Sequence, residues 1–208
     1  KEIFVDLFYE KKNTKIDTTR TIGISKSNID FFNREITNIK KMLWPIKKIK
    51  IFTENSNDKE ILKFEDQKDN LFSILQNQKI FNQLIIELKK SKFFKFKKYT
   101  KYRKSDYLSY DLIINCDIRN EITKRYFSKK FEKEYNSIAF TTIIDHIKLS
   151  SNNEAIQIFT NDGPIAFLPI SNEKTSIVYS ARMKKYKTES EINKIINKFN
   201  PKYEIKKI

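Results

Sequence analysis

The chain has 208 residues, of which 39% are hydrophobic and 13% aromatic, enough for a packed core in one sizeable domain or two small ones. No apolar run reaches the ~18–20 residues that a membrane-spanning helix needs, and the first ten residues carry acids where a signal peptide would be apolar. One cysteine, Cys116, excludes an internal disulfide framework and predicts a cytoplasmic location. The start at Lys1 rather than methionine indicates a fragment.

The net charge of +16 admits two interpretations. A basic chain can bind nucleic acid or an anionic membrane, and the basic stretch Lys89–Lys104 is interleaved with aromatic residues that could stack on single-stranded bases. The same alternation is typical of a strand with one buried and one solvated face. Lysine, asparagine and isoleucine are enriched together along the whole chain, which favours a general compositional bias over a dedicated binding surface.

The first half of the chain alternates between expected strands and helices. Ile3–Tyr9 reads as a short buried strand, and Ser25–Ile36 as a helix capped by its first serine or by the next one. Ile46–Thr53 and Glu60–Glu65 are expected to be two strands around a turn. Gln76–Lys90 is the clearest helix, because its apolar residues recur at helical spacing and two lysines end it.

The second half is expected to be mostly antiparallel. Tyr110–Asn115 reads as a buried strand of the parallel-sheet type, and Ser137–Leu149 as a longer strand. Residues 154–181 follow as a meander of three strands. In this meander Asn161-Asp162-Gly163 forms a turn, because glycine adopts positive φ without steric cost.

The last expected element is a helix that starts at Thr188, where Thr188 and Glu191 have capping-box spacing. The order of the elements predicts an α+β fold. We expect residues 1–125 to form a partial nucleotide-binding domain and residues 126–208 an antiparallel sheet with a C-terminal helix. The strands near residues 46–65 are expected to join that sheet.

Residues 159–180, FTNDGPIAFLPISNEKTSIVYS, resemble a signature of the FAD-dependent aromatic hydroxylases of ubiquinone biosynthesis. That signature has the form R-F-x-x-x-G-P-L-A-x-L-P-L-x-x-x-x-S-x-V-W-S. Ile158 replaces its arginine and Tyr179 its tryptophan. The matching residues are Phe159, Gly163, Pro164, Ala166, Leu168, Pro169, Ser176, Val178 and Ser180.

The resemblance implies an FAD-binding half of the glutathione-reductase type that precedes a substrate-binding sheet. In the family, a G-x-G-x-x-G turn holds the FAD pyrophosphate and a G-D-A-A-H segment completes the flavin site. The 208 residues contain neither segment, so they correspond to roughly the middle of a complete enzyme. We therefore expect the isolated chain to be inactive and to hold FAD weakly.

Three cofactor contacts follow from the resemblance. Glu10 or its neighbour Tyr9 corresponds to the acid that binds the FAD ribose. Arg20, in the segment Asp17–Ile24, corresponds to an arginine near the flavin and its phosphates. Asp117, in DLIINCDIRN, corresponds to the aspartate of an Asp-Gly pair near FAD, although Ile118 stands in place of the glycine.

The resemblance implies hydroxylation of a polyprenylated phenol, with FAD as cofactor and NAD(P)H or an external reductase as electron donor. It also implies association with the inner-membrane surface or with a ubiquinone-biosynthesis complex, and it makes nucleic acid the weaker partner. The flavin supplies the chemistry, so no catalytic side chain is assigned. His146, the single histidine, is expected to be structural, and no metal-ligand spacing is present. A flavin hydroxylase of another aromatic compound and a non-catalytic nucleic-acid-binding protein remain the alternatives.

Overall fold

The computed structural model describes residues 2–9, 17–55, 59–66, 68–98, 109–118, 120–127, 129, 131–182 and 188–208. The chain divides into two compact units, and each is described by itself. The first unit takes in residues 1–15 and 88–135, and the second takes in residues 16–87 and 136–208. The division into cofactor and substrate domains at residues 125 and 126 stays a prediction.

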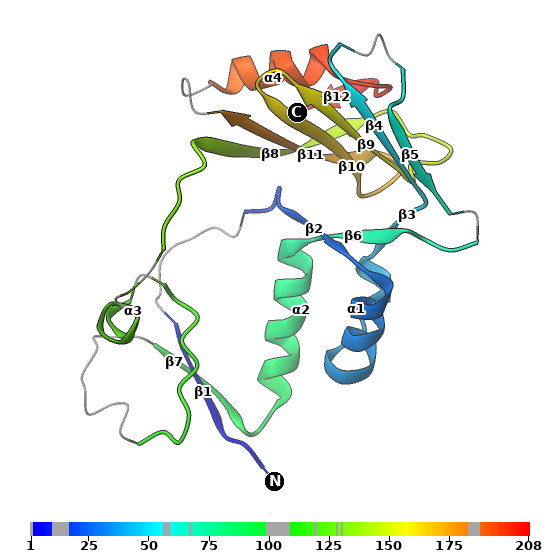
Figure 1. The fold of residues 1–208 in the computed structure, drawn as a ribbon. Helices are drawn as coiled ribbons and strands as arrows, with labels where there is room; N and C mark the ends of the chain where they lie inside the picture. Colours follow the sequence, from blue (N-terminus) through cyan, green and yellow to red (C-terminus); the bar gives the residue numbers. More distant parts are fainter. Residues whose placement is uncertain are drawn as a thin grey trace. The chain divides into compact units, whose positions relative to one another are not determined.

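The second unit is built on a seven-stranded sheet, in the order β12-β8-β11-β10-β9-β4-β5 (Figure 1). Four long strands form its centre and pair antiparallel. Two further strands extend one side of the sheet. β4 runs parallel to β9, and β5 runs antiparallel to β4. The bounds are β4 (Lys48–Thr53), β5 (Leu62–Glu65), β8 (Ser137–His146), β9 (Glu154–Thr160), β10 (Gly163–Pro169), β11 (Lys174–Arg182) and β12 (Ile205–Lys207).

The expected meander is confirmed, including its turn. Gly163 has φ = 138° at the start of β10, a backbone conformation that residues with a Cβ rarely adopt. Helix α4 (Glu189–Lys198) is also confirmed, with its capping box. The Thr188 side chain accepts from the backbone N–H of Glu191, and the Glu191 carboxylate accepts from the backbone N–H of Thr188.

A smaller antiparallel sheet in the same unit has the order β2-β6-β3. Its strands are β2 (Thr21–Ile24), β3 (Trp44–Ile46) and β6 (Phe72–Gln76), and β2 and β6 were not expected. Helix α1 (Lys26–Phe31) follows the Ser25 cap and continues as a π-helical turn over Phe32–Ile36. Helix α2 (Asn77–Lys90) follows β6 directly and matches the expected helix within one residue.

The first unit contains the parallel pair of β1 (Val5–Tyr9) and β7 (Phe94–Lys98), and helix α3 (Glu121–Tyr126). The expected buried strand Tyr110–Asn115 is wrong: these residues form no strand, and Leu112 and Ile114 are 76% and 77% exposed. An apolar run signals a strand only where another strand pairs with it. Among the described residues none pairs with this segment.

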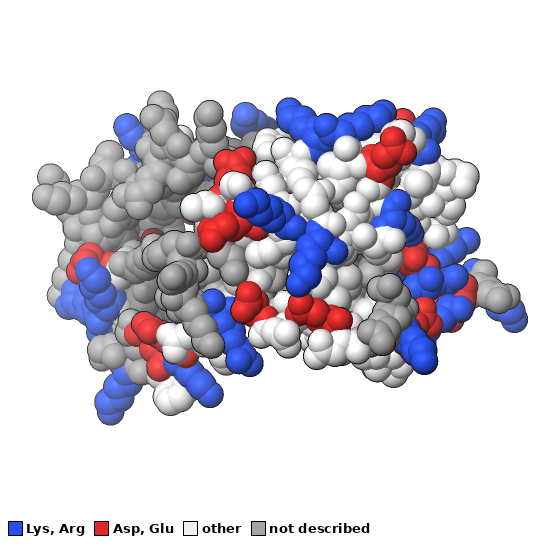
Figure 2. All heavy atoms as spheres, turned by 90° about the horizontal axis from the view of Figure 1, so that it is seen from above, with Lys and Arg blue, Asp and Glu red and all other residues white. Residues whose placement is uncertain are grey.

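The basic and aromatic stretch of the first unit is partly explained by β7. The Lys97 ammonium lies 2.7 Å from the Asp6 carboxylate, which also accepts a hydrogen bond from the Tyr110 hydroxyl. These two hydrogen bonds lower the pKa of Asp6. Figure 2 shows basic side chains scattered among acidic and uncharged ones over the described surface. No described helix is long and apolar enough to cross a membrane.

Candidate functional site

The seven-stranded sheet has two chemically different faces, because successive side chains of a strand point to opposite sides. One face packs against α4 and forms the largest core cluster of the unit (Figure 1). The register places Ile165 beside Tyr179 and Phe167 beside Ile177 on this face. All four of these side chains are at most 1% exposed, so this face is the structural one.

We call the opposite side of the central strands the open face. Register defines its members: Ala166 lies beside Gln157 on β9 and beside Val178 on β11, and Val178 lies beside Thr141 on β8. These four side chains are half-buried, whereas the α4 face is closed. The open face is thus lined by uncharged and mostly small side chains that water can reach; it comprises Ala139, Thr141, Gln157, Phe159, Pro164, Ala166, Val178 and Ser180.

Most residues that match the hydroxylase signature share this side of the sheet. Strand alternation places Pro164, Ala166 and Leu168 of β10 there, and Ser176, Val178 and Ser180 of β11. Their apolar neighbours in sequence fill the core under α4 instead. Pro164, Ala166, Val178 and Ser180 lie on the accessible part of this side, whereas Ser176 is buried and Leu168 packs against the cluster of Ile46, Ile74 and Ala155.

The segment Asp17–Arg20 is fastened to this side of the sheet. The Thr19 Oγ1 atom lies 2.8 Å from Thr141 Oγ1 and donates to the Asp17 carboxylate over 2.6 Å. Because the Thr19 hydroxyl has one proton, Thr141 is the donor to Thr19. Two residues on, Thr21 Oγ1 lies 3.1 Å from the buried Ser176 Oγ. Sequence reasoning missed Thr141, since nothing local connects it to a residue 122 positions away.

Arg20 is exposed at the end of this fastened segment. Its backbone carbonyl accepts from the N–H of Asn77, the first residue of α2, over 3.0 Å. The pKa of Asp17 is lowered first by the hydroxyl and backbone hydrogen bonds of Thr19 and then by the positive charge of Arg20. The structure thus holds the backbone of Arg20 in place and leaves its guanidinium accessible; its contact with FAD stays a prediction.

The other two predicted cofactor residues belong to the first unit. Glu10 lies outside the described residues. Asp117 is exposed in a polar turn, where its carbonyl accepts from the Thr123 hydroxyl over 2.8 Å. Ile118, which replaces the family's glycine, is 81% exposed and is not among the residues with positive φ, so the replacement imposes no backbone strain.

His146 belongs to a buried polar network in the sheet and is structural, as expected. Its Nε2 atom lies 3.1 Å from the Thr175 hydroxyl and its Nδ1 atom 2.8 Å from the Ile147 carbonyl. Asn152 donates to the same hydroxyl and accepts from Tyr203 over 3.2 Å. Every polar group named here has a protein partner, which leaves His146 no free nitrogen for a substrate. Among the described residues no cluster of acidic, histidine or cysteine side chains could hold a metal ion.

The two glycines of the chain do not form a phosphate-binding turn. Gly23 lies within β2, where a Cβ would meet the Phe72 ring at 3.4 Å, and Gly163 begins a strand of the meander. A dinucleotide cradle needs glycines at a strand-to-helix turn, so that the backbone can approach the pyrophosphate. These 208 residues by themselves therefore do not fit FAD.

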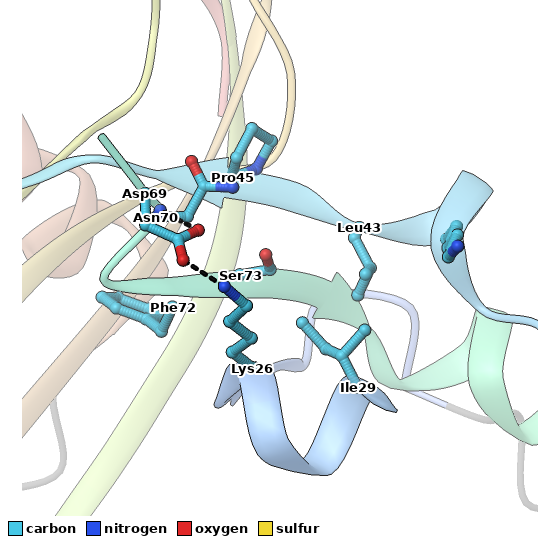
Figure 3. Close-up of a pocket in the computed structure, with 9 residues that line it drawn as sticks. Lys26, Ile29, Leu43, Pro45, Asp69, Asn70, Phe72 and Ser73 are labelled. Carbon is cyan, nitrogen blue, oxygen red and sulfur yellow. Dashed lines mark hydrogen bonds and ion pairs between the residues drawn. The ribbon is translucent and has the colours of Figure 1, made fainter. Parts of the chain in front are cut away.

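A separate hollow of about 330 Å³ lies beside α1 and the smaller sheet (Figure 3). The ammonium of Lys26 on α1 pairs with the carboxylate of Asp69 before β6 across its mouth. Both charged groups are largely exposed, so the pair ties the helix to the turn without creating a charged cavity. The hollow is lined by Lys26, Ile29, Lys40, Leu43, Pro45, Asp69, Asn70, Phe72 and Ser73.

No family model and no curated protein matches the sequence. Solved structures do share the fold. A crystal structure of PqsL, described as a probable FAD-dependent monooxygenase from Pseudomonas aeruginosa, superposes with a TM-score of 0.62 at 8% identity, over 92% of this chain and 56% of PqsL. A mutant of PqsL gives 0.64 at 10% identity, over 85% and 54%, and FqzB gives 0.61 at 12%, over 89% and 49%.

At these identities the likeness establishes a common fold, and the chain spans about half the length of the structures it matches. The expected α+β fold class is confirmed, and the chain shares its fold with PqsL, a probable FAD-dependent monooxygenase.

Proposed function

We propose that this chain is the substrate-binding part of an FAD-dependent aromatic monooxygenase that hydroxylates a polyprenylated phenol in ubiquinone biosynthesis. The observation that carries the proposal is the open face: Pro164, Ala166, Val178 and Ser180 of the hydroxylase signature lie half-buried on one side of the sheet, and the Asp17–Arg20 segment is fastened to that same side. The fold shared with PqsL supports the monooxygenase class. The signature in residues 159–180 supports the narrower substrate.

The chemistry of the open face suits an uncharged aromatic ring with a long apolar substituent. Ala166 and Val178 present small apolar side chains, and Gln157 and Ser180 carry uncharged hydrogen-bonding groups. FAD would supply oxygen activation when bound. Since these residues lack the glycine turn, the pyrophosphate would require polypeptide beyond them. NAD(P)H or an external reductase is proposed as the electron source.

Substrate binding gives the first test. Isothermal titration of the chain with a short-chain prenylphenol should show binding, and Ala166→Phe should weaken it at least about tenfold by filling the open face. Lys194→Phe, on the exposed side of α4, is the matched control and should bind normally. Absence of binding to the wild-type chain, or equal loss in both variants, would contradict the assignment of the face.

Cofactor retention gives the second test. We expect the 208-residue chain to release FAD during gel filtration, with no flavin absorbance in the protein peak. Stoichiometric retention would show that the missing glycine turn is replaced within these residues.

Activity gives a third test. Incubation of the gene product in its natural length with FAD, NADPH and a prenylphenol should yield a product that has gained one oxygen atom, detected by mass spectrometry.

The proposed substrate also predicts where the protein works. A polyprenylated phenol partitions into the bilayer, so we propose that the enzyme works at the inner-membrane surface or within a ubiquinone-biosynthesis complex. Co-sedimentation with vesicles that contain prenylphenol should exceed that with vesicles that lack it. Equal sedimentation in both would leave no role for the substrate in recruitment.

A further inference from the structure

Strand β5 is the last strand on one side of the seven-stranded sheet, as far as the described residues extend (Figure 1). All four of its residues are exposed, including two large apolar side chains: Leu62 is 52% exposed and Phe64 49%. Ile61, just before the strand, is 50% exposed. A strand with an unpaired edge is a template for another strand, and on β5 two large apolar side chains alternate with two charged ones, Lys63 and Glu65.

The free hydrogen-bonding groups of this edge can be assigned to particular residues. Asp66 donates its backbone N–H to the Lys47 carbonyl of the neighbouring strand segment over 3.1 Å. In an antiparallel pair the residues that exchange hydrogen bonds alternate, so Leu62 and Phe64 also face β4. Lys63 and Glu65 therefore direct their N–H and C=O groups to the open edge.

We propose that β5 is an interaction surface for a second copy of this chain, paired antiparallel about a two-fold axis at Phe64. In this register Lys63 lies opposite Glu65 of the second copy, and Glu65 lies opposite Lys63 of the second copy. The outward backbone groups of these two residues are the ones that such pairing uses. Charge and backbone hydrogen bonding therefore select the same register.

The neighbouring registers are unfavourable. An axis at Lys63 would place two lysines opposite each other, and like charges in directly opposed positions destabilise a sheet. A shift by one residue would place Lys63 opposite Phe64 and mix the polar and apolar faces. The axis at Phe64 keeps Leu62 and Phe64 of both copies on one side and also places no like charges opposite each other.

The apolar side of the pair continues the open face. Leu62 lies beside Ile51 and Phe64 beside Ile49, and Ile51 lies beside Gln157 of β9. The charged side already holds Lys48 and Lys63 within 3.0 Å and 2.5 Å of the Glu65 carboxylate, so the second copy extends an existing ladder of charges. Four residues per copy form a small interface, which predicts a weak, concentration-dependent dimer. The inference does not depend on the proposed enzymatic function.

Sedimentation equilibrium over a wide concentration range tests the proposal. The wild-type chain should show a monomer–dimer equilibrium. Lys63→Glu should raise the dissociation constant at least about tenfold, because it creates two pairs of like charges at once. Adding Glu65→Lys to that variant should restore dimerisation to within about threefold of the wild type, because the charges again oppose each other.

Two further variants separate edge pairing from other causes. Lys63→Pro removes an outward N–H without removing a donor to β4, and should abolish the dimer while circular dichroism shows a folded chain. Lys206→Glu makes the same charge change on β12, at the opposite edge of the sheet, and should dimerise like the wild type. A chain that is monomeric at the highest concentrations, or a dimer indifferent to Lys63→Glu and Lys63→Pro, overturns the proposal.

Discussion

Gly163 and Ser180 approach so closely across the meander that a Cβ added to Gly163 would lie 1.9 Å from the Ser180 carbonyl oxygen. The obstacle is backbone, which cannot move aside as the end of a flexible side chain can. The positive φ of 138° adds a second reason for glycine at this position. The first residue of β10 therefore lies directly against the backbone near the end of β11.

Gly163→Ala should therefore destabilise the chain by about 2–4 kcal/mol, since it combines a steric clash with a strained backbone. Urea denaturation followed by tryptophan fluorescence measures the loss. Gly23→Ala is the matched control, because its Cβ would meet only the Phe72 ring at an ordinary 3.4 Å. A difference of less than about 0.5 kcal/mol between the two variants would contradict the close approach.

The contact between Thr19 and Thr141 should be detectable as a coupling energy. In a double-mutant cycle with Thr19→Val and Thr141→Val, we expect about 0.5–1.5 kcal/mol of coupling, as for one hydrogen bond between partly buried hydroxyls. Thr142→Val, on the opposite face of the same strand, should couple to Thr19→Val by close to zero. Equal coupling for both threonines would mean that the segment is not fastened to the open face.

Tyr203 should make the chain sensitive to alkaline pH. Burial, reinforced by the negative charge of Glu154, raises the pKa of Tyr203 from 10.0 to about 12. The unfolded chain therefore loses this proton first, so the contribution is complete below pH 10 and is lost as the pH rises to about 12. It amounts to about 2–3 kcal/mol.

Denaturation of the wild-type chain and of Tyr203→Phe at pH 8, 10 and 11.5 checks this contribution. The phenylalanine keeps the ring that stacks on Phe167, and its stability should fall less between pH 10 and pH 11.5. Parallel pH profiles would show that Tyr203 is not the group responsible.

Glu154 should make the stability of the folded chain depend on pH under acidic conditions. Burial alone would raise the pKa of its carboxyl group, but the ammonium groups of Lys202 and Lys50, at 3.3 Å and 3.1 Å, lower it overall. A lowered pKa stabilises the folded chain above the usual value of 4.5, and the contribution is lost as the pH falls below it. The stability difference between wild type and Glu154→Gln should thus shrink from pH 6 to pH 3 in urea titrations.

The capping box of α4 gives a prediction on stability alone. Thr188→Ala removes the hydroxyl that accepts from the Glu191 backbone and should cost about 1 kcal/mol. Ser190→Ala, inside the first turn and equally exposed, should cost little or nothing. Thermal denaturation monitored by circular dichroism measures both changes.

Elements with strong local signals could be predicted from the sequence. The meander followed from its alternation and from Gly163, and α4 from the spacing of Thr188 and Glu191. In both elements the interacting residues are close together in the chain, so the local sequence pattern is enough to predict the structure. A structural role for His146 was expected, but its contact with Thr175, 29 positions away, depends on the pairing of β8 with β11.

Elements that depend on a distant partner could not be predicted. Thr21–Ile24 and Phe72–Gln76 pair across fifty residues of chain, and neither is apolar enough by itself to mark a strand. Tyr110–Asn115 is the opposite case, since it has the composition of a buried strand but no strand beside it among the described residues. The composition of a segment shows whether it can form a strand, and pairing with another strand decides whether it does.

The candidate site shows the same division. The sequence by itself determined the residues of the hydroxylase signature and the segment Asp17–Arg20, because both are contiguous stretches. Only the tertiary structure decided that they meet: hydroxyl contacts from Thr19 to Thr141 and from Thr21 to Ser176 join residues 122 and 155 positions apart. The physical reason is that sheet register, which places every second side chain on one face, is set by long-range pairing that no local pattern records.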